Sequence, residues 1–154
     1  MKFDGSDMGK WAAPLYEEIV PNYWIEGYGG TGYDHKQTWC ACLCEIMGTN
    51  FKKDMTILDY GCGPAHLGAF VSSFLKKFSY YGLDLEGSVN PLTNEKTLSI
   101  ASRNLENDPR VRIGAIGTPI EQTAIKEADV IVLGSVFTHL DIKDTFALLD
   151  KFLD

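Results

Sequence analysis

TILDYGCGPAHLG, at residues 56–68, predicts a short apolar strand that runs into a glycine turn and then into a helix. Asp59 lies at the end of the strand, just before Gly61 and Gly63. Glycine has no Cβ, so the backbone can turn tightly here and approach a ligand closely. The helix that follows directs its N-terminal N–H groups at whatever occupies the turn. This arrangement is typical of a nucleotide-type cofactor pocket in an α/β protein.

Strand-like and helix-like segments alternate through the rest of the chain. We expect strands at residues 55–60, 79–85, 111–116 and 128–134, and helices at residues 65–77, 95–105, 118–126 and 142–153. Such alternation predicts an α/β fold with a parallel sheet and right-handed crossovers. The fourth strand is rich in Val and Ile, which is typical of a strand buried on both faces.

The N-terminal third of the chain is predicted to be helical and is unusually aromatic. We expect a helical cap at residues 1–50, with a helix at 35–47, and one core at residues 55–154, all in a single domain. The aromatic side chains of this cap either cover the cofactor pocket or simply pack against the sheet. They are Tyr16, Tyr23, Trp24, Tyr28 and Tyr33.

The chain is acidic, with 14 Lys and Arg against 21 Asp and Glu, a formal charge of −7 and a pI near 4.9. This balance argues against a protein that binds nucleic acid through its phosphates. No stretch approaches the roughly 18 consecutive apolar residues that a membrane span needs. The polar N-terminus is unlike a secretory signal. We therefore expect a cytoplasmic protein with neither a nucleic-acid nor a membrane partner.

The four cysteines do not predict a metal site. Cys40, Cys42 and Cys44 alternate before the first predicted strand, and Cys62 lies in the glycine turn. A zinc site usually needs Cys-x-x-Cys spacing or nearby histidines, and this cluster offers neither. Cys40 and Cys44 are one helical turn apart, so they fit a buried helix face. A disulfide is disfavoured in a reducing cytosol.

A second carboxylate, Asp84, lies at the tip of the strand predicted at residues 79–85. In a nucleotide-binding unit, a carboxylate at this place accepts hydrogen bonds from the ribose hydroxyls. The alternative is a structural role as a turn former or helix cap. We favour the ribose-binding role, because Asp84 follows the glycine turn at the place where a ribose ligand is expected.

Three motifs, taken in order, resemble those of class I S-adenosylmethionine-dependent methyltransferases. They are ILDYGCGPA at residues 57–65, GLD at 82–84 and ADVIVLGSVFTHL at 128–140. The resemblance implies a Rossmann-like sheet with strand order 3-2-1-4. It also implies S-adenosylmethionine as cofactor, S-adenosylhomocysteine as product and a small-molecule acceptor. Positioning dominates the rate enhancement of such an in-line methyl transfer.

The resemblance assigns the first motif to the amino end of the cofactor. Asp59 would orient that end through water. Gly61 and Gly63 would let the backbone pass beside the cofactor, and Cys62 between them is also expected to contact it.

The next positions would hold the adenosine. The resemblance implies that Asp84 binds the ribose and that Leu85 flanks the adenine. The usual acidic residue after the third strand is missing here, so we expect backbone groups of Ile116 or Gly117 to contact the adenine, with Glu121 as the alternative.

The segment after the fourth strand would line the methyl-donor side. The resemblance places Ser135 and Val136 there, and His139 is the candidate catalytic base because its unperturbed pKa is near ~6.5. Packing or capping is the alternative role for His139. The Asn/Asp-Pro-Pro-Tyr/Phe element of enzymes that methylate bases is replaced by GSVF at residues 134–137, which also favours a small-molecule acceptor.

Two other functions are compatible with these motifs. One is an S-adenosylmethionine-binding module without transfer activity. The other, less favoured, is an NAD-dependent oxidoreductase. Its Gly-x-Gly-x-x-Gly fingerprint is interrupted by Ala65 and His66, although Gly68 could serve as the third glycine.

Complete methyltransferases of this class continue with a fifth strand and an antiparallel hairpin, for which this chain has no room. We therefore expect a truncated or minimal form of the fold. Its fourth strand would then be an apolar edge, which is a site for pairing with a second copy or a partner subunit.

Overall fold

The structure is a computed structural model, and it describes residues 54–74, 77–91, 93–134 and 136–153. The cap expected at residues 1–50 lies outside the described residues, with its helix at 35–47 and three of the four cysteines. These expectations therefore stay predictions. Within the described part of the chain, no helix has both the length and the apolar composition that crossing a membrane requires.

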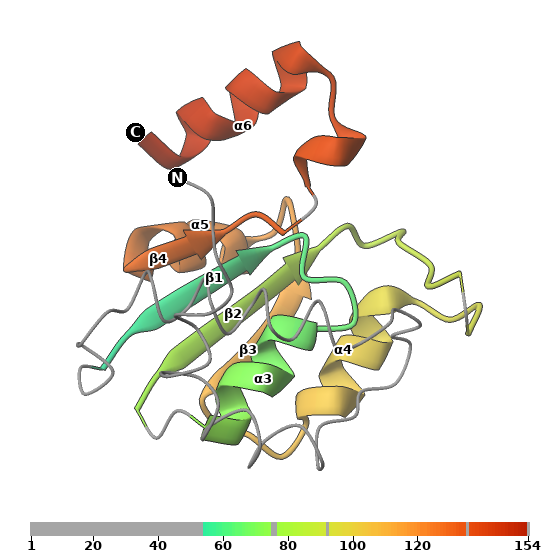
Figure 1. The fold of residues 1–154 in the computed structure, drawn as a ribbon, viewed down its shortest axis with the longest axis vertical. Helices are drawn as coiled ribbons and strands as arrows, with labels where there is room; N and C mark the ends of the chain where they lie inside the picture. Colours follow the sequence, from blue (N-terminus) through green and yellow to red (C-terminus); the bar gives the residue numbers. More distant parts are fainter. Residues whose placement is uncertain (1–53, 75–76, 92, 135, 154) are drawn as a thin grey trace, which may run out of the picture.

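A single sheet of four parallel strands forms the centre of the described structure (Figure 1). The strands are β1 (Thr56–Tyr60), β2 (Ser79–Asp84), β3 (Val111–Ala115) and β4 (Val130–Val132). Their order is β3-β2-β1-β4, which confirms the Rossmann-like α/β fold expected from the sequence. The chain first adds strands on one side of β1 and then crosses to its other side. This reversal creates a topological switch point, where α/β proteins commonly bind ligands.

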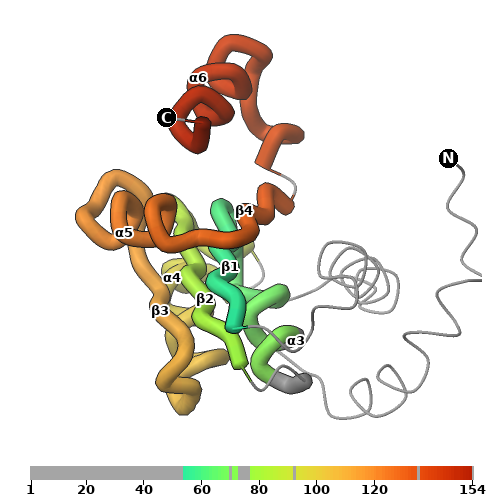
Figure 2. Tube along the Cα trace, turned by 90° about the vertical axis from the view of Figure 1, so that its left-hand side faces the viewer, coloured from blue at the N-terminus to red at the C-terminus, as the bar shows by residue number. Residues whose placement is uncertain are grey.

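Helices cover both faces of this sheet. They are α3 (His66–Phe74), α4 (Thr97–Leu105) and α5 (Pro119–Glu127). After β4 come a short 3-10 turn, η3 (Phe137–His139), and the last helix, α6 (Ile142–Leu153). In Figure 1, α3 and α4 lie in front of the sheet and α5 lies behind it, and Figure 2 shows α3 and α5 on opposite sides. The helix expected at residues 142–153 has these same bounds in the structure.

The alternation of side chains along the strands produces two apolar cores. Ile57 and Tyr80 face α3 and α4, whereas Leu58 and Tyr81 face α5. All four side chains are almost completely buried. β1 and β2 are therefore covered on both faces, as expected for the central strands of a parallel sheet.

β4 is shorter than the strand expected at residues 128–134. The carboxylate of Asp129 accepts a hydrogen bond from the N–H of Thr56, and pairing with β1 begins only at Val130. The side chains of Val130 and Ile131 are partly buried. Val132 is buried, and Val130 packs against the same core, whereas Ile131 packs against the core on the α5 face. Both faces of β4 therefore contact an apolar core, although β4 is the edge of the described sheet and pairs only with β1 there.

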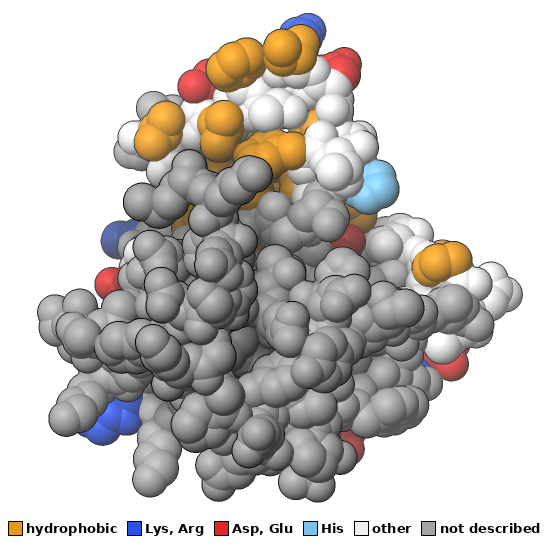
Figure 3. Space-filling view, viewed as in Figure 1, with side chains coloured by type: hydrophobic (Ala, Val, Ile, Leu, Met, Phe, Trp, Pro, Cys, Tyr) orange, Lys and Arg blue, Asp and Glu red, His pale blue; other side chains and the backbone are white. Residues whose placement is uncertain are grey.

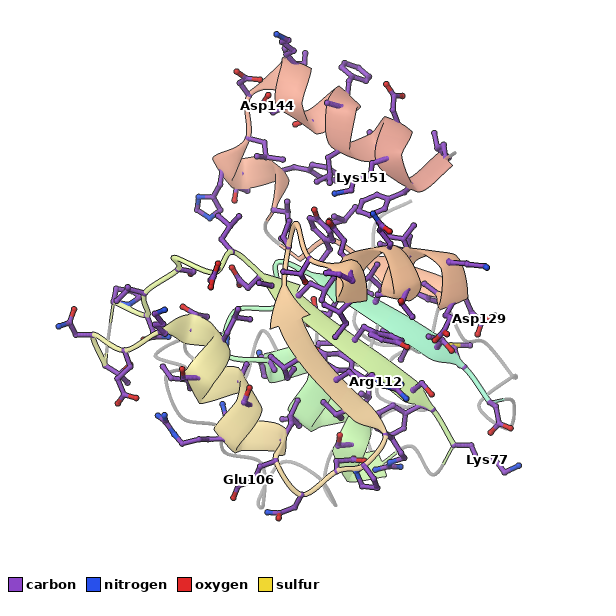
Figure 4. All side chains as sticks on the ribbon, turned by 180° about the vertical axis from the view of Figure 1, so that it is seen from behind. Lys77, Glu106, Arg112, Asp129, Asp144 and Lys151 are labelled. Carbon is purple, nitrogen blue, oxygen red and sulfur yellow. The ribbon has the colours of Figure 1, made fainter. Side chains whose placement is uncertain are left out.

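α6 lies apart from the sheet, above β4 and α5 (Figure 1), and its Lys151 points toward the core (Figure 4). Glu121 of α5 ties α6 to the core. Lys151 of α6 donates to Glu121 Oε1 at 2.5 Å, and the Tyr60 hydroxyl donates to the same oxygen at 2.6 Å. The N–H of Gly117 donates to Oε2 at 3.0 Å. The rings of Tyr60 and Phe152 meet edge to face at 5.2 Å.

Glu121 is buried, and its charge is stabilised by these donors. Burial alone would raise the pKa of Glu121, but the hydrogen bonds from Lys151, Tyr60 and Gly117 outweigh it and hold the pKa below its ordinary value of 4.5. A carboxyl with a lowered folded-state pKa stabilises the fold above its unfolded pKa, and this contribution is lost as the pH falls through the folded value.

We expect Glu121→Gln to lower the free energy of unfolding by about 1 kcal/mol near neutral pH, since Lys151 is partly exposed and solvent screens the pair. Urea unfolding checks this value. The difference from the wild type should shrink as the pH falls below 4.5, where Glu121 itself becomes protonated. Glu106→Gln, an exposed change of the same kind, should stay within about 0.5 kcal/mol. A loss for Glu121→Gln that does not change with pH would contradict this role of the charge.

Candidate functional site

The glycine turn after β1 is held against the end of β2. The backbone N–H groups of Gly61 and Cys62 both donate to the carbonyl oxygen of Leu83, at 2.7 and 2.9 Å. The N–H of Ala65 closes the turn on the carbonyl of Cys62 at 3.0 Å. From α4, the amide of Asn104 donates to the backbone of the turn. These hydrogen bonds hold the turn against the carboxyl ends of the central strands β1 and β2, so it continues the sheet rather than forming a separate loop.

Two glycines of this turn have positive φ angles but different surroundings. Gly61 has φ +79°, and a Cβ there would lie 2.6 Å from Cγ2 of Val136. Gly63 has φ +55°, and a Cβ there would meet no atom of the described residues within 4 Å. Gly61 thus allows close packing against the segment after β4. The open space beside Gly63 leaves room for a ligand to approach the backbone.

Asp84 is held beside the same turn. Its Oδ2 accepts a hydrogen bond from the N–H of Gly63 at 2.7 Å, and its Oδ1 accepts one from the N–H of Leu85 at 2.7 Å. A carboxylate has about four acceptor positions, so each oxygen keeps capacity for another donor. The carboxylate is therefore oriented by the backbone and still able to bind a pair of hydroxyl groups.

A cavity of about 540 Å³ opens beyond the carboxyl ends of the strands, between the sheet and α6. Its volume is within the range of pockets for small ligands and cofactors. The residues that line it come from the ends of β1 and β2, the segments after β3 and β4, η3 and α6. They are Tyr60, Gly61, Asp84, Leu85, Ser88, Ile116, Gly134, Val136, His139, Leu140, Asp144 and Leu148.

The structure brings most of the site residues expected from the sequence to this cavity. Those that line it are Gly61, Asp84, Leu85, Ile116, Val136 and His139. Asp59, Cys62, Gly63 and Gly117 lie in or next to the same segments but are not among the lining residues, and Ser135 lies outside the described residues. The structure holds no ligand, so the binding roles of all these residues stay predictions.

Glu121, the alternative adenine contact, has a different place in the structure. Its carboxylate points to Tyr60, Gly117 and Lys151, and it does not line the cavity. Ile116 lines the cavity, and its N–H donates to the carbonyl of Asp84. The N–H of Gly117 donates to Glu121, so the backbone N–H groups of Ile116 and Gly117 are both engaged within the protein. Of the three expected adenine contacts, Ile116 alone lines the cavity.

Six lining residues were not predicted as site residues, and three of them belong to α6 or the segment before it. The six are Tyr60, Ser88, Gly134, Leu140, Asp144 and Leu148. Asp144 and Leu148 are one helical turn apart on the cavity side of α6. Ile142, Phe146 and Leu153 of the same helix are exposed, and Figure 3 shows hydrophobic side chains gathered over α6. Because α6 carries apolar residues on more than one side, its sequence did not indicate which side faces the cavity.

Asp59 is buried behind the turn, with an exposed fraction of 4%. The hydroxyl of Tyr80 donates to Asp59 Oδ2 at 2.6 Å. Burial raises the pKa of Asp59 to about 7, although the hydrogen bond from Tyr80 lowers it and the nearby charge of Asp84 raises it further. A carboxyl in this state changes its charge near neutral pH.

Cys62 and His66 are buried at the turn and at the start of α3. Cys62 is a free thiol, and burial raises its pKa, as do the charges of Asp59 and Asp84. The thiolate is the nucleophilic form of cysteine, so this thiol is suited to packing rather than to covalent catalysis.

His139 is exposed at the rim of the cavity. It ends η3, and its N–H donates to the carbonyl of Val136 at 3.0 Å. The imidazole can therefore reach both the cavity and solvent, as a proton acceptor in this site would need to do.

Metal ions in proteins need a group of ligand side chains around them. Within the described ranges, no group of three or more His, Cys, Asp or Glu side chains is placed to hold a metal ion.

Neither the comparison with protein-family models nor the comparison with curated proteins finds a match to this chain. The function is therefore inferred from the sequence motifs and from the site itself.

We expect Gly61→Ala to destabilise the protein more than Gly63→Ala. Both changes place alanine at a positive φ angle, which costs about 1–2 kcal/mol. Only the Cβ at position 61 would also collide with Val136. Urea unfolding of the two variants measures the difference, and equal losses would contradict the close packing at Gly61.

Proposed function

We propose that this protein binds S-adenosylmethionine in the cavity and transfers its methyl group to a small-molecule acceptor. The observation that carries the proposal is the position of Asp84. Its carboxylate is held by the N–H of Gly63 at the mouth of the cavity, where the ribose of a nucleoside would meet it. The three motifs that resemble class I methyltransferases support the same function.

The charges around the cavity support a cationic ligand. Asp84 and Asp144 line it, and its described lining residues include no Lys or Arg. S-adenosylmethionine is a net cation at neutral pH, because its sulfonium and ammonium outweigh its one carboxylate, and the two carboxylates in the wall would favour such a ligand. The diphosphate of NAD would instead meet like charge. This contrast favours the methyl donor over a nicotinamide cofactor.

The apolar part of the cavity wall, formed by the segment after β4 and by α6, would contact the methyl acceptor. When bound, S-adenosylmethionine supplies a methyl carbon that the acceptor attacks in line with the carbon–sulfur bond. Val136, Leu140 and Leu148 would pack around the reactants and exclude water. His139 would take the proton of the acceptor where the acceptor must lose one.

Calorimetric titration with S-adenosylmethionine, S-adenosylhomocysteine and NAD tests the binding proposal. We expect the first two ligands to bind and NAD not to bind. Asp84→Asn should weaken binding by about 10- to 100-fold, because it removes a charge-assisted hydrogen bond to the ribose.

Glu86→Gln is the matched control for this titration. Glu86 is exposed two residues after Asp84 and is not among the residues that line the cavity. The control removes the same charge as Asp84→Asn. Because Glu86 does not line the cavity, its loss should leave the affinity unchanged. If NAD binds and the other two ligands do not, the protein belongs to the oxidoreductase alternative.

A screen for release of S-adenosylhomocysteine in the presence of candidate acceptors tests transfer. With an acceptor that loses a proton, we expect His139→Ala to lower kcat by about 10²- to 10⁴-fold while the affinity for S-adenosylmethionine stays the same. Binding without turnover across the screen would favour a cofactor-binding module. If kcat of His139→Ala equals that of the wild type, His139 is not the proton acceptor.

A further inference from the structure

The wall that α6 contributes to the cavity carries one charged side chain, and it lies outside the motifs that the sequence analysis used. Asp144 and Leu148 line the cavity from α6, and Leu140 lines it from the segment before this helix. Asp144 is exposed, whereas both leucines are half-buried. The carboxylate therefore borders an apolar surface and is accessible to a ligand.

Contacts at both ends of α6 fix the position of this wall. Asp141 Oδ1 accepts a hydrogen bond from the N–H of Asp144 at 2.8 Å, which caps the first turn of the helix. In the last turn, Lys151 donates to the buried Glu121, and Phe152 contacts the ring of Tyr60. The backbone at Asp144 is thus held by the protein itself, before any ligand binds.

The charge of Asp144 has no neutralising partner within the described part of the chain. None of the ion pairs formed by the described residues includes Asp144. Lys151 lies two helical turns further along the same side of α6, near its other end (Figure 4), and its ammonium is engaged by Glu121. Lys143 is adjacent to Asp144 in the chain, so the two side chains do not face each other. A cation from outside the protein can therefore pair with this carboxylate.

The chemistry of the wall ranks the ligands that it can bind. An ionised carboxylate only accepts hydrogen bonds, so its partner must be a donor. A charged N–H donor makes a bond about twice as strong as that of a neutral donor. An anion would meet Asp84 and Asp144 as like charges. The wall therefore favours a positively charged amine over an alcohol, and an alcohol over an acid.

Asp144 belongs to a different part of the cavity from the expected ribose ligand. Asp84 is at the end of β2, next to Leu85, and its carbonyl accepts a hydrogen bond from the N–H of Ile116. Asp144 comes instead from α6, which lies apart from the sheet (Figures 1 and 4). A nucleoside that meets Asp84 would occupy the strand ends. Asp144 is then left for the second reactant.

We propose that the methyl acceptor carries a positively charged amine, and that Asp144 selects it by pairing with this amine while Leu140 and Leu148 pack on the apolar part of the molecule. This inference rests on the proposed function, because it assigns the rest of the cavity to S-adenosylmethionine. It names a substrate class, which the resembled motifs leave open.

The test is NMR titration of the ¹⁵N-labelled full chain, saturated with S-adenosylhomocysteine, with phenethylamine, phenethyl alcohol and phenylacetate. These probes present an ammonium, a hydroxyl and a carboxylate on similar apolar bodies. We expect the affinity to fall in that order, with the amine bound about tenfold more tightly than the alcohol. Asp144→Asn keeps the shape of the side chain and removes its charge, so the preference for the amine should fall to about twofold or less.

Asp150→Asn is the matched control. Asp150 is exposed on the same helix and does not line the cavity. Its loss removes the same charge from α6 and should leave the order and the size of the preference unchanged. The amide signals that shift on titration, expected at residues 136–148, show whether the amine binds at this wall.

Three outcomes would overturn the proposal. They are equal affinities of the wild type for the amine and the alcohol, a preference for the amine that survives Asp144→Asn, and an equal loss of preference in Asp150→Asn. The cofactor gives a further readout. If Asp144→Asn weakens S-adenosylmethionine about tenfold and leaves S-adenosylhomocysteine unchanged, Asp144 pairs with the sulfonium and not with the acceptor.

Failure of the proposed function can be told apart from failure of this inference. If neither S-adenosylmethionine nor S-adenosylhomocysteine binds, the proposed function fails. The three probes are then titrated into the cofactor-free wild type and Asp144→Asn. A preference for the amine that depends on Asp144 would still support an amine site at α6, and its absence would overturn this inference separately.

Discussion

The carbonyl oxygen of Leu83 accepts hydrogen bonds from two successive N–H groups, those of Gly61 and Cys62. This pairing bends the chain sharply after β1 and requires the positive φ angle of Gly61. It also places the N–H of Gly63 against the carboxylate of Asp84. The orientation of the Asp84 carboxylate and the position of the turn before α3 follow from this contact between the turn and the end of β2.

Each face of the sheet buries one carboxyl beside a tyrosine hydroxyl, with opposite results. Glu121 also receives hydrogen bonds from Lys151 and Gly117, so its pKa stays below the ordinary value. Asp59 receives one from Tyr80 and lies near the negative Asp84, so its pKa rises to about 7. The first carboxyl is therefore ionised at neutral pH and connects α5 to α6. The second has a pKa near neutral pH and no such ion pair among the described residues.

Much of the fold could be predicted because its signals are local. Apolar strands, the glycine turn and the periodicity of the helix at residues 142–153 each depend on neighbouring residues, and the strand order followed from the resembled family. The length of β4 was overestimated, because the Val-rich composition of residues 128–134 resembles that of a longer central strand. In the structure the Asp129 carboxylate accepts the N–H of Thr56, and the ladder with β1 begins at Val130, which no local pattern reveals.

The sequence by itself determined the parallel α/β architecture, the glycine turn and the adjacent carboxylate of Asp84, since backbone conformation and strand ends depend on short-range chemistry. Only the tertiary structure decided which groups face each other across elements. It showed that α6 closes the cavity with Asp144 and Leu148, and that Tyr80 reaches Asp59 between Gly68 and Gly82. These contacts join residues that are distant in the chain, so their distances and burial exist only once the strands have paired and the helices have packed on them.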